Sequence, residues 1–163
     1  MKLINLCLLI IGVMHCSAQK DSNIQQIKGK YFEGYIFPKT YTDFIPIENA
    51  TDRFTPQQED ILKAEEILNE QLANLNRDLL NQTGSCPIIH KKLSKYKRQY
   101  IGIITENGDK VVWINFVWKK DKGVLKKYGN EIIIIIDGCS YYWNVKVNLT
   151  KGKLFDLNIN GSA

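Results

Sequence analysis

Residues 55–81 carry the clearest helical pattern in the chain. Apolar side chains recur every three or four positions and form one stripe: Ile61, Ala64, Leu68, Leu72, Leu75 and Leu79. Thr55 and Pro56 suit the start of a helix, and Gly84 follows its end. The spacing predicts a helix about 35–40 Å long with one apolar face.

From residue 97 onward the apolar period changes to two. Segments 97–105 and 110–119 alternate in this way and flank an Asn-Gly dipeptide, which is a strong signal for a β-hairpin. A two-residue loop places Ile101 opposite Ile114 on an apolar core face. It places Tyr100 on the other face, which is mixed in character.

The last part of the chain predicts a second hairpin, with a three-residue loop at 150–152. This loop pairs Val145 with Leu157 and leaves a polar opposite face, whereas a two-residue loop would mix apolar and polar side chains on both faces. The five consecutive isoleucines at 132–136 predict a central strand.

These elements predict an α+β domain over residues 55–163, in which one long helix packs across a four-stranded antiparallel meander sheet. One face of that sheet is expected to be buried and the other free. Residues 19–54, with scattered aromatic residues and two prolines, are expected to form an irregular lead-in containing one or two short extended pieces.

The order of a helix, then YKRQYIGIITENGDKVVWINFVW, then DGCSYYWNVKVNLTKGKLFDLNINGSA resembles small exported proteins of Bacteroidota without an assigned function. The resemblance covers roughly residues 45–163 and implies a structure but no chemistry. The helix-on-meander order is also similar to the cystatin-like arrangement. The first hairpin tip reads Glu-Asn-Gly-Asp in place of the glutamine-valine-glycine loop of cystatins, so protease inhibition is not implied.

Residues 1–18 read as a secretory signal peptide. Lys2 precedes an apolar run, and small residues stand at the −3 and −1 positions of a cleavage after Ala18. The alternative is a bacterial lipoprotein anchored through Cys16, although bulky residues precede that cysteine. The apolar run is short for a membrane span, and no later segment of about 20 apolar residues follows. Export to the periplasm or the extracellular space is therefore expected.

Two cysteines, Cys86 and Cys139, remain after this cleavage. An even number of cysteines in an oxidising compartment favours one disulfide bond. The alternative is two buried thiols.

Composition excludes a disordered tail, a fibre and a multi-domain assembly, because the 163 residues are 44% hydrophobic and 24% charged.

Charge is unevenly spread: residues 86–127 hold 11 basic and 3 acidic side chains. The basic residues group in two runs: Lys91, Lys92, Lys95, Lys97 and Arg98, then Lys119, Lys120, Lys122, Lys126 and Lys127. Such a rim attracts acidic polysaccharides or anionic lipids, and export argues against nucleic acid. The alternative is a solvated edge that resists aggregation.

Catalytic signals are weak. His90 is the only histidine after the signal peptide, and with Cys86 it supplies too few ligands for a zinc site. The sequence has neither a phosphate-binding glycine loop nor a serine nucleophile elbow. No enzyme activity, metal or cofactor is therefore predicted.

The expected free face of the sheet is the candidate binding surface, because aromatic rings beside amides can stack on and hydrogen-bond a sugar or a protein. Its residues are Arg98, Tyr100, Trp113, Asn115, Tyr142, Asn144 and Asn158. The sequence thus predicts a non-enzymatic binding module of the cell envelope, whose partner is an acidic or sugar ligand or an envelope protein. Two alternatives are a small hydrolase or isomerase with a site between helix and sheet, and a structural or accessory envelope protein.

Overall fold

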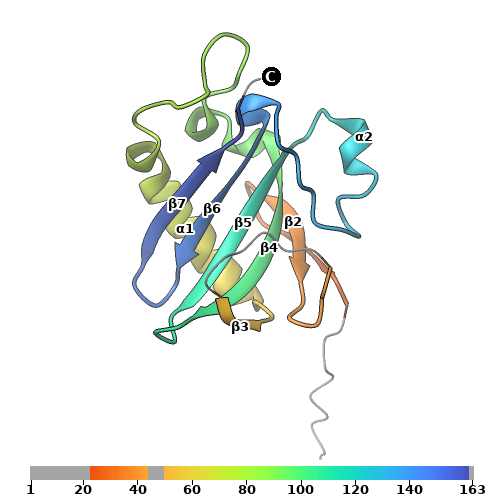
Figure 1. Ribbon diagram of the computed structural model, residues 1–163, viewed down its shortest axis with the longest axis vertical. Coiled ribbons are helices and arrows are strands. Elements are labelled where there is room, and N and C mark those ends of the chain that lie inside the picture. Colours follow the sequence, from red (N-terminus) through yellow and green to blue (C-terminus); the bar gives the residue numbers. More distant parts are fainter. Residues whose placement is uncertain (1–22, 44–49, 162–163) are drawn as a thin grey trace, which may run out of the picture.

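The computed structural model describes residues 23–43 and 50–161 and contains one seven-stranded mixed sheet with a single long helix on one face (Figure 1). The prediction of a four-stranded antiparallel meander is therefore wrong. Along the sheet the strands follow the order β1-β2-β4-β5-β6-β7, and β3 also pairs with β4. Their bounds are β1 (Gln25–Lys28), β2 (Glu33–Phe37), β3 (Ala50–Phe54), β4 (Tyr96–Thr105), β5 (Lys110–Trp118), β6 (Tyr142–Asn148) and β7 (Lys153–Ile159).

Three of these strands come from the region that was expected to be an irregular lead-in. β1 and β2 form an antiparallel pair, and β2 then lies parallel to the first half of β4. Gly34 permits this parallel contact, because a Cβ atom there would lie 2.3 Å from the carbonyl oxygen of Arg98. β3 pairs with the second half of β4, so β4 has neighbours along its whole length.

The helix α1 (Gln58–Leu75) is shorter than the predicted 55–81 but buries the predicted stripe as far as Leu72. It begins after Gln57, whose backbone N–H donates to the Asp60 carboxylate at 3.0 Å. It lies across β5, β6 and β7 (Figure 1). Its end at Asn76 marks a change of role, because that side chain enters a buried hydrogen-bond network instead of continuing the apolar stripe.

The first hairpin is shifted by one residue from the prediction. Ile101 pairs with Trp113, not with Ile114. The cause is a three-residue loop: the Thr105 N–H donates to the Asp109 carbonyl at 3.1 Å, and Gly108 takes the left-handed φ of +77° that such loops require.

The second hairpin matches the predicted register only at its open end. Trp143 pairs with Ile159, and Asn144 pairs with Asn158, as predicted. Nearer the loop the pairing shifts by one residue. Asp156 lies at this bulge with a left-handed φ of +53°.

The connection between β5 and β6 covers the second face of the sheet. It contains α2 (Lys122–Leu125) and ends in the short helix η3 (Cys139–Tyr141). The isoleucine run is not a strand: Ile132 and Ile133 are buried against the sheet, whereas Ile136 is 91% exposed. Both faces are thus covered, and the expectation of a free face does not hold.

Two further short helices, η1 (Ile89–Lys91) and η2 (Leu93–Lys95), connect α1 to β4. The predicted disulfide between Cys86 and Cys139 is confirmed, with its Cα atoms 6.1 Å apart. The predicted signal peptide lies outside the described residues. Among the residues that are described, no helix has the length and apolarity to cross a membrane.

Candidate functional site: an aromatic groove beside the disulfide

The corrected register places two of the seven predicted binding residues under the helix. Arg98 and Tyr100 point toward α1 and are 1% and 0% exposed. The guanidinium Nε of Arg98 and the hydroxyl of Tyr100 both donate to Oε1 of Glu65, at 2.9 and 2.8 Å. Neither residue lies on an outer surface.

Trp113 and Asn115 lie on the opposite face but are buried beneath the β5–β6 connection. They are 2% and 7% exposed. The Asn115 amide donates to the Ile133 carbonyl at 2.7 Å, and Ile132 packs in the cluster that contains Trp113. These two residues therefore hold the covering segment in place.

Tyr142, Asn144 and Asn158 remain nearer the surface. Asn144 is half-buried and accepts a hydrogen bond from the Trp113 indole N–H at 3.1 Å, whereas Asn158 is exposed. The seven residues are thus divided among three environments, and Tyr142 lines a groove at the end of the sheet.

That groove lies at one end of the sheet and has a volume of about 480 Å³. We call it the aromatic groove, and its lining residues are Trp118, Lys120, Asp121, Lys122, Tyr141 and Tyr142. Trp118 ends β5, the charged residues follow it in the chain, and the two tyrosines lie where η3 meets β6. Residues from two distant segments thus meet here.

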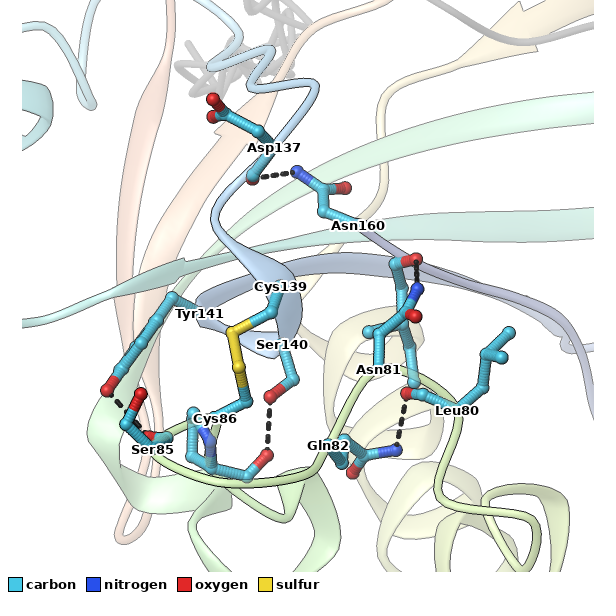
Figure 2. The surroundings of a disulfide bond; sticks show 12 residues. Leu80, Asn81, Gln82, Ser85, Cys86, Asp137, Cys139, Ser140, Tyr141 and Asn160 are labelled. Carbon is cyan, nitrogen blue, oxygen red and sulfur yellow. Dashed lines mark hydrogen bonds between the residues drawn. A yellow bond between two sulfur atoms is a disulfide. The ribbon is translucent and has the colours of Figure 1, made fainter. Parts of the chain in front are cut away.

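The aromatic rings of the groove are held at fixed angles. The rings of Trp118 and Tyr141 meet edge to face, with centroids 5.1 Å apart. Tyr96 supports the indole from within the core, at 5.0 Å. The Tyr141 hydroxyl donates to the Ser85 carbonyl at 2.8 Å, which fixes the outer ring (Figure 2). The platform is therefore preorganised.

Asp121 connects the groove to α2. One carboxylate oxygen accepts from the Val124 N–H at 3.0 Å and caps the helix, while the other accepts from the Tyr142 hydroxyl. The Tyr142 hydrogen bond is the main cause that lowers the pKa of Asp121. Burial, with the Asp121 charge beside it, raises the pKa of Tyr142. The phenol therefore stays protonated, and the carboxylate stays charged but occupied by its two donors.

The disulfide fixes the tyrosine side of the groove to the loop before η1. Figure 2 shows Cys86 linked to Cys139, with Ser85 beneath Tyr141. The Ser140 hydroxyl donates to the Pro87 carbonyl at 2.6 Å and makes a second link between the same two segments.

The predicted basic rim is partly neutralised. Glu33 binds both Lys97 and Lys119, at 2.6 and 3.0 Å, and these two lysines lower its pKa to about 2. Arg98 is paired with Glu65. The lysines of the rim that have no ion pair among the described residues are Lys91, Lys92, Lys95, Lys120, Lys122 and Lys126. Two of them, Lys120 and Lys122, line the aromatic groove.

His90 is half-buried at the end of α1, where its Nδ1 lies 2.9 Å from the Asn76 amide nitrogen. Within the described ranges, no group of three or more histidine, cysteine or acidic side chains is placed to hold a metal ion. The groove itself presents aromatic rings, two lysines and the Asp121 carboxylate, which accepts from the Tyr142 hydroxyl.

No protein-family model matches this chain, and no curated protein or solved structure matches it either. The resemblance to exported Bacteroidota proteins and to the cystatin-like arrangement therefore stays a prediction.

The sequence reasoning missed Trp118 and Tyr141. Trp118 stands at the end of an alternating strand and immediately before a run of lysines, and Tyr141 follows Cys139 by two positions. An aromatic residue next to a disulfide cysteine, together with one next to a charged run, was the available signal. The pairing of β5 with β6, which places Val117 opposite Tyr142, brings the two segments together.

Proposed function

We propose that this protein is a non-enzymatic binding module of the cell envelope that takes an acidic saccharide in the aromatic groove. One observation carries the proposal: Trp118 and Tyr141 line the same groove as Lys120 and Lys122. Aromatic faces stack on the C–H faces of sugar rings, and lysines attract carboxylate or sulfate groups. The combination fits a ligand that carries both a sugar ring and an acidic group.

The shape of the groove supports a chain-like ligand. Its volume of about 480 Å³ is that of a ligand site, yet the groove is open to solvent along the sheet end. An acidic oligosaccharide can lie along such a surface with one ring on the aromatic platform. The lysines then contact the acidic groups of that ring or the next.

Export is part of the same proposal. The pattern of residues 1–18 is that of a signal peptide, and a disulfide bond persists in oxidising compartments such as the periplasm. An exported protein reaches the acidic polysaccharides that surround the outside of cells.

The experiment is a titration of the mature chain with oligogalacturonate, measured by isothermal calorimetry. The double variant Lys120→Gln with Lys122→Gln should weaken binding about tenfold or more, which corresponds to about 1.4 kcal/mol. Both lysines are exposed and have no ion pair within residues 23–43 and 50–161, so the fold should be unchanged. Neutral maltohexaose should bind more weakly than the acidic probe.

The matched control is Lys63→Gln with Lys153→Gln, which removes the same charge from exposed positions elsewhere. It should change the affinity less than about twofold, since distant exposed charges are largely screened. Equal losses in the two double variants would mean that the probe senses net charge only. That result, or no binding to the unaltered chain, would reject the proposal.

A further inference from the structure

A second concave site lies between α1, the short helices η1 and η2, and β4. This cleft has a volume of about 240 Å³, and its lining includes Glu65, Asn69, His90, Ser94 and Arg98. It shares no lining residue with the aromatic groove. Its volume lies just below the usual range for ligand pockets, which suits a ligand with a single ring.

The floor of the cleft is the buried ion pair of Glu65 and Arg98. Oε1 of Glu65 accepts both hydrogen bonds to that carboxylate, from Arg98 and Tyr100, and Nη1 of Arg98 donates to the Tyr96 carbonyl at 2.9 Å. In the described part of the chain, Oε2 of Glu65 and Nη2 of Arg98 have no hydrogen-bond partner. Both residues line the cleft, with side chains that are only 5% and 1% exposed.

The ion pair is a costly way to attach α1 to the sheet. Charges buried to this extent lose their hydration, and apolar replacements are often equally stable. The pair supplies something that an apolar contact cannot. It places one hydrogen-bond acceptor and one donor side by side at the bottom of a cleft.

His90 lies in the wall of the cleft. The buried hydrogen-bond network at the end of α1 determines which of its ring nitrogens carries the proton. The Gln82 amide is oriented by two backbone groups, because its nitrogen donates to the Leu80 carbonyl at 3.1 Å and its oxygen accepts from the Ile89 N–H at 2.9 Å. The Asn76 amide pairs with Gln82 through both of its atoms, so its nitrogen faces His90. Nδ1 of His90 therefore accepts, and the ring proton is on Nε2.

We infer that this cleft binds a single neutral sugar ring, with one ring hydroxyl accepting from Nη2 of Arg98 and donating to Oε2 of Glu65. A hydroxyl is the group that does both. At the floor of the cleft a carboxylate ligand would face the charge of Glu65. An ammonium ligand would face the charges of Arg98 and of Lys91, which also lines the cleft. The Nε2–H of His90, the hydroxyl of Ser94 and the amide of Asn69 provide polar neighbours for the remaining hydroxyls.

The cleft and the aromatic groove have no lining residue in common, so variants of one leave the other unchanged. The test is a heteronuclear NMR titration of the labelled mature chain with methyl glycosides of neutral hexoses, with acetate and acetamide as comparison probes. The sugar should produce saturable shifts at the Nε–H of Arg98 and at the backbone amide of Ser94. The two lysine substitutions in the aromatic groove should leave these shifts unchanged.

Ser94→Phe occludes the cleft without touching the buried pair, because Ser94 is exposed on η2. This variant should lose at least tenfold in sugar affinity. Thr83→Phe, at an exposed loop position outside the cleft, should retain the original affinity. Stronger binding of acetate or acetamide than of every sugar would overturn the inference, as would sugar shifts confined to Trp118 and Tyr141 or an unchanged affinity in Ser94→Phe.

Discussion

The side chain of Gln99 holds the covering segment on the second face of the sheet, and replacing it is a direct test of that arrangement. Gln99 is fully buried on β4. Its amide nitrogen donates to the carbonyls of Tyr128 and Glu131, both at 2.7 Å. Its oxygen accepts from the Ile133 N–H at 2.9 Å and from the Asn115 amide at 3.0 Å.

The substitution Gln99→Met keeps a similar shape and removes all four hydrogen bonds. A typical bond contributes about 1 kcal/mol, so we expect the free energy of unfolding to fall by about 3–5 kcal/mol. Gln26→Met is the matched control, because Gln26 is exposed on β1. Its effect should stay within about 0.5 kcal/mol.

Urea denaturation gives the two free energies, and hydrogen exchange gives the local effect. The Ile133 amide should be protected in the unaltered chain and should exchange much faster in Gln99→Met. A loss below about 1 kcal/mol, with the Ile133 amide still protected, would show that this amide network does not hold the segment on the sheet.

Three other predictions concern charges and the covalent link. Two lysines hold the pKa of Glu33 at about 2. The stabilisation that Glu33 contributes is therefore complete above the ordinary glutamate pKa of about 4.3, and it is lost as the pH falls toward 2. Glu33→Gln should therefore flatten the fall in stability over that pH range, as followed by denaturation at several pH values. Arg98→Met alone should cost about 3–5 kcal/mol in urea denaturation, and adding Glu65→Met should recover most of it; a double variant no more stable than the single one would contradict this. Replacing Cys86 and Cys139 by serine should cost about 4 kcal/mol, and an unchanged melting temperature would refute that value.

Local patterns were enough to predict the presence of α1 and of the two hairpins, but not their exact bounds and registers, and to predict the disulfide. The stripe from Ile61 to Leu72 has the helical period over three turns, and it is buried as expected. Cys86 and Cys139 were the only pair left after the predicted cleavage. These inferences depend on neighbouring residues or on simple counting, so no knowledge of long-range contacts was needed.

The faces of the sheet cannot be assigned from the sequence, because the alternation of apolar and polar residues separates core from solvent only in a sheet with one solvated face. β4 is a central strand covered on both sides, so its Arg98 and Gln99 are both buried although they point in opposite directions. A one-residue difference in loop length then exchanged the partners of every position in the first hairpin. Gly108 fits both loop lengths, and nothing local decides between them.

The N-terminal strands were missed for a different reason. β1 and β2 have only four and five residues, and β2 pairs in parallel with a strand about 60 positions later. The isoleucine run misled in the opposite direction. The run predicts a strand, yet its residues cover the sheet without joining it, and within the run only Ile132 and Ile133 are buried. Nothing in the neighbouring sequence indicates that β1 and β2 join the sheet or that the isoleucine run does not.

The most direct test of the aromatic groove uses its own tryptophan as the reporter. Of the three tryptophans, Trp113 and Trp143 are buried, and Trp118 alone lines the groove. The measurement is the indole N–H spectrum of the labelled mature chain during titration with oligogalacturonate. We expect the Trp118 signal to shift and saturate while the signals of Trp113 and Trp143 stay in place. A Trp118 signal that does not move while the probe binds would contradict the account.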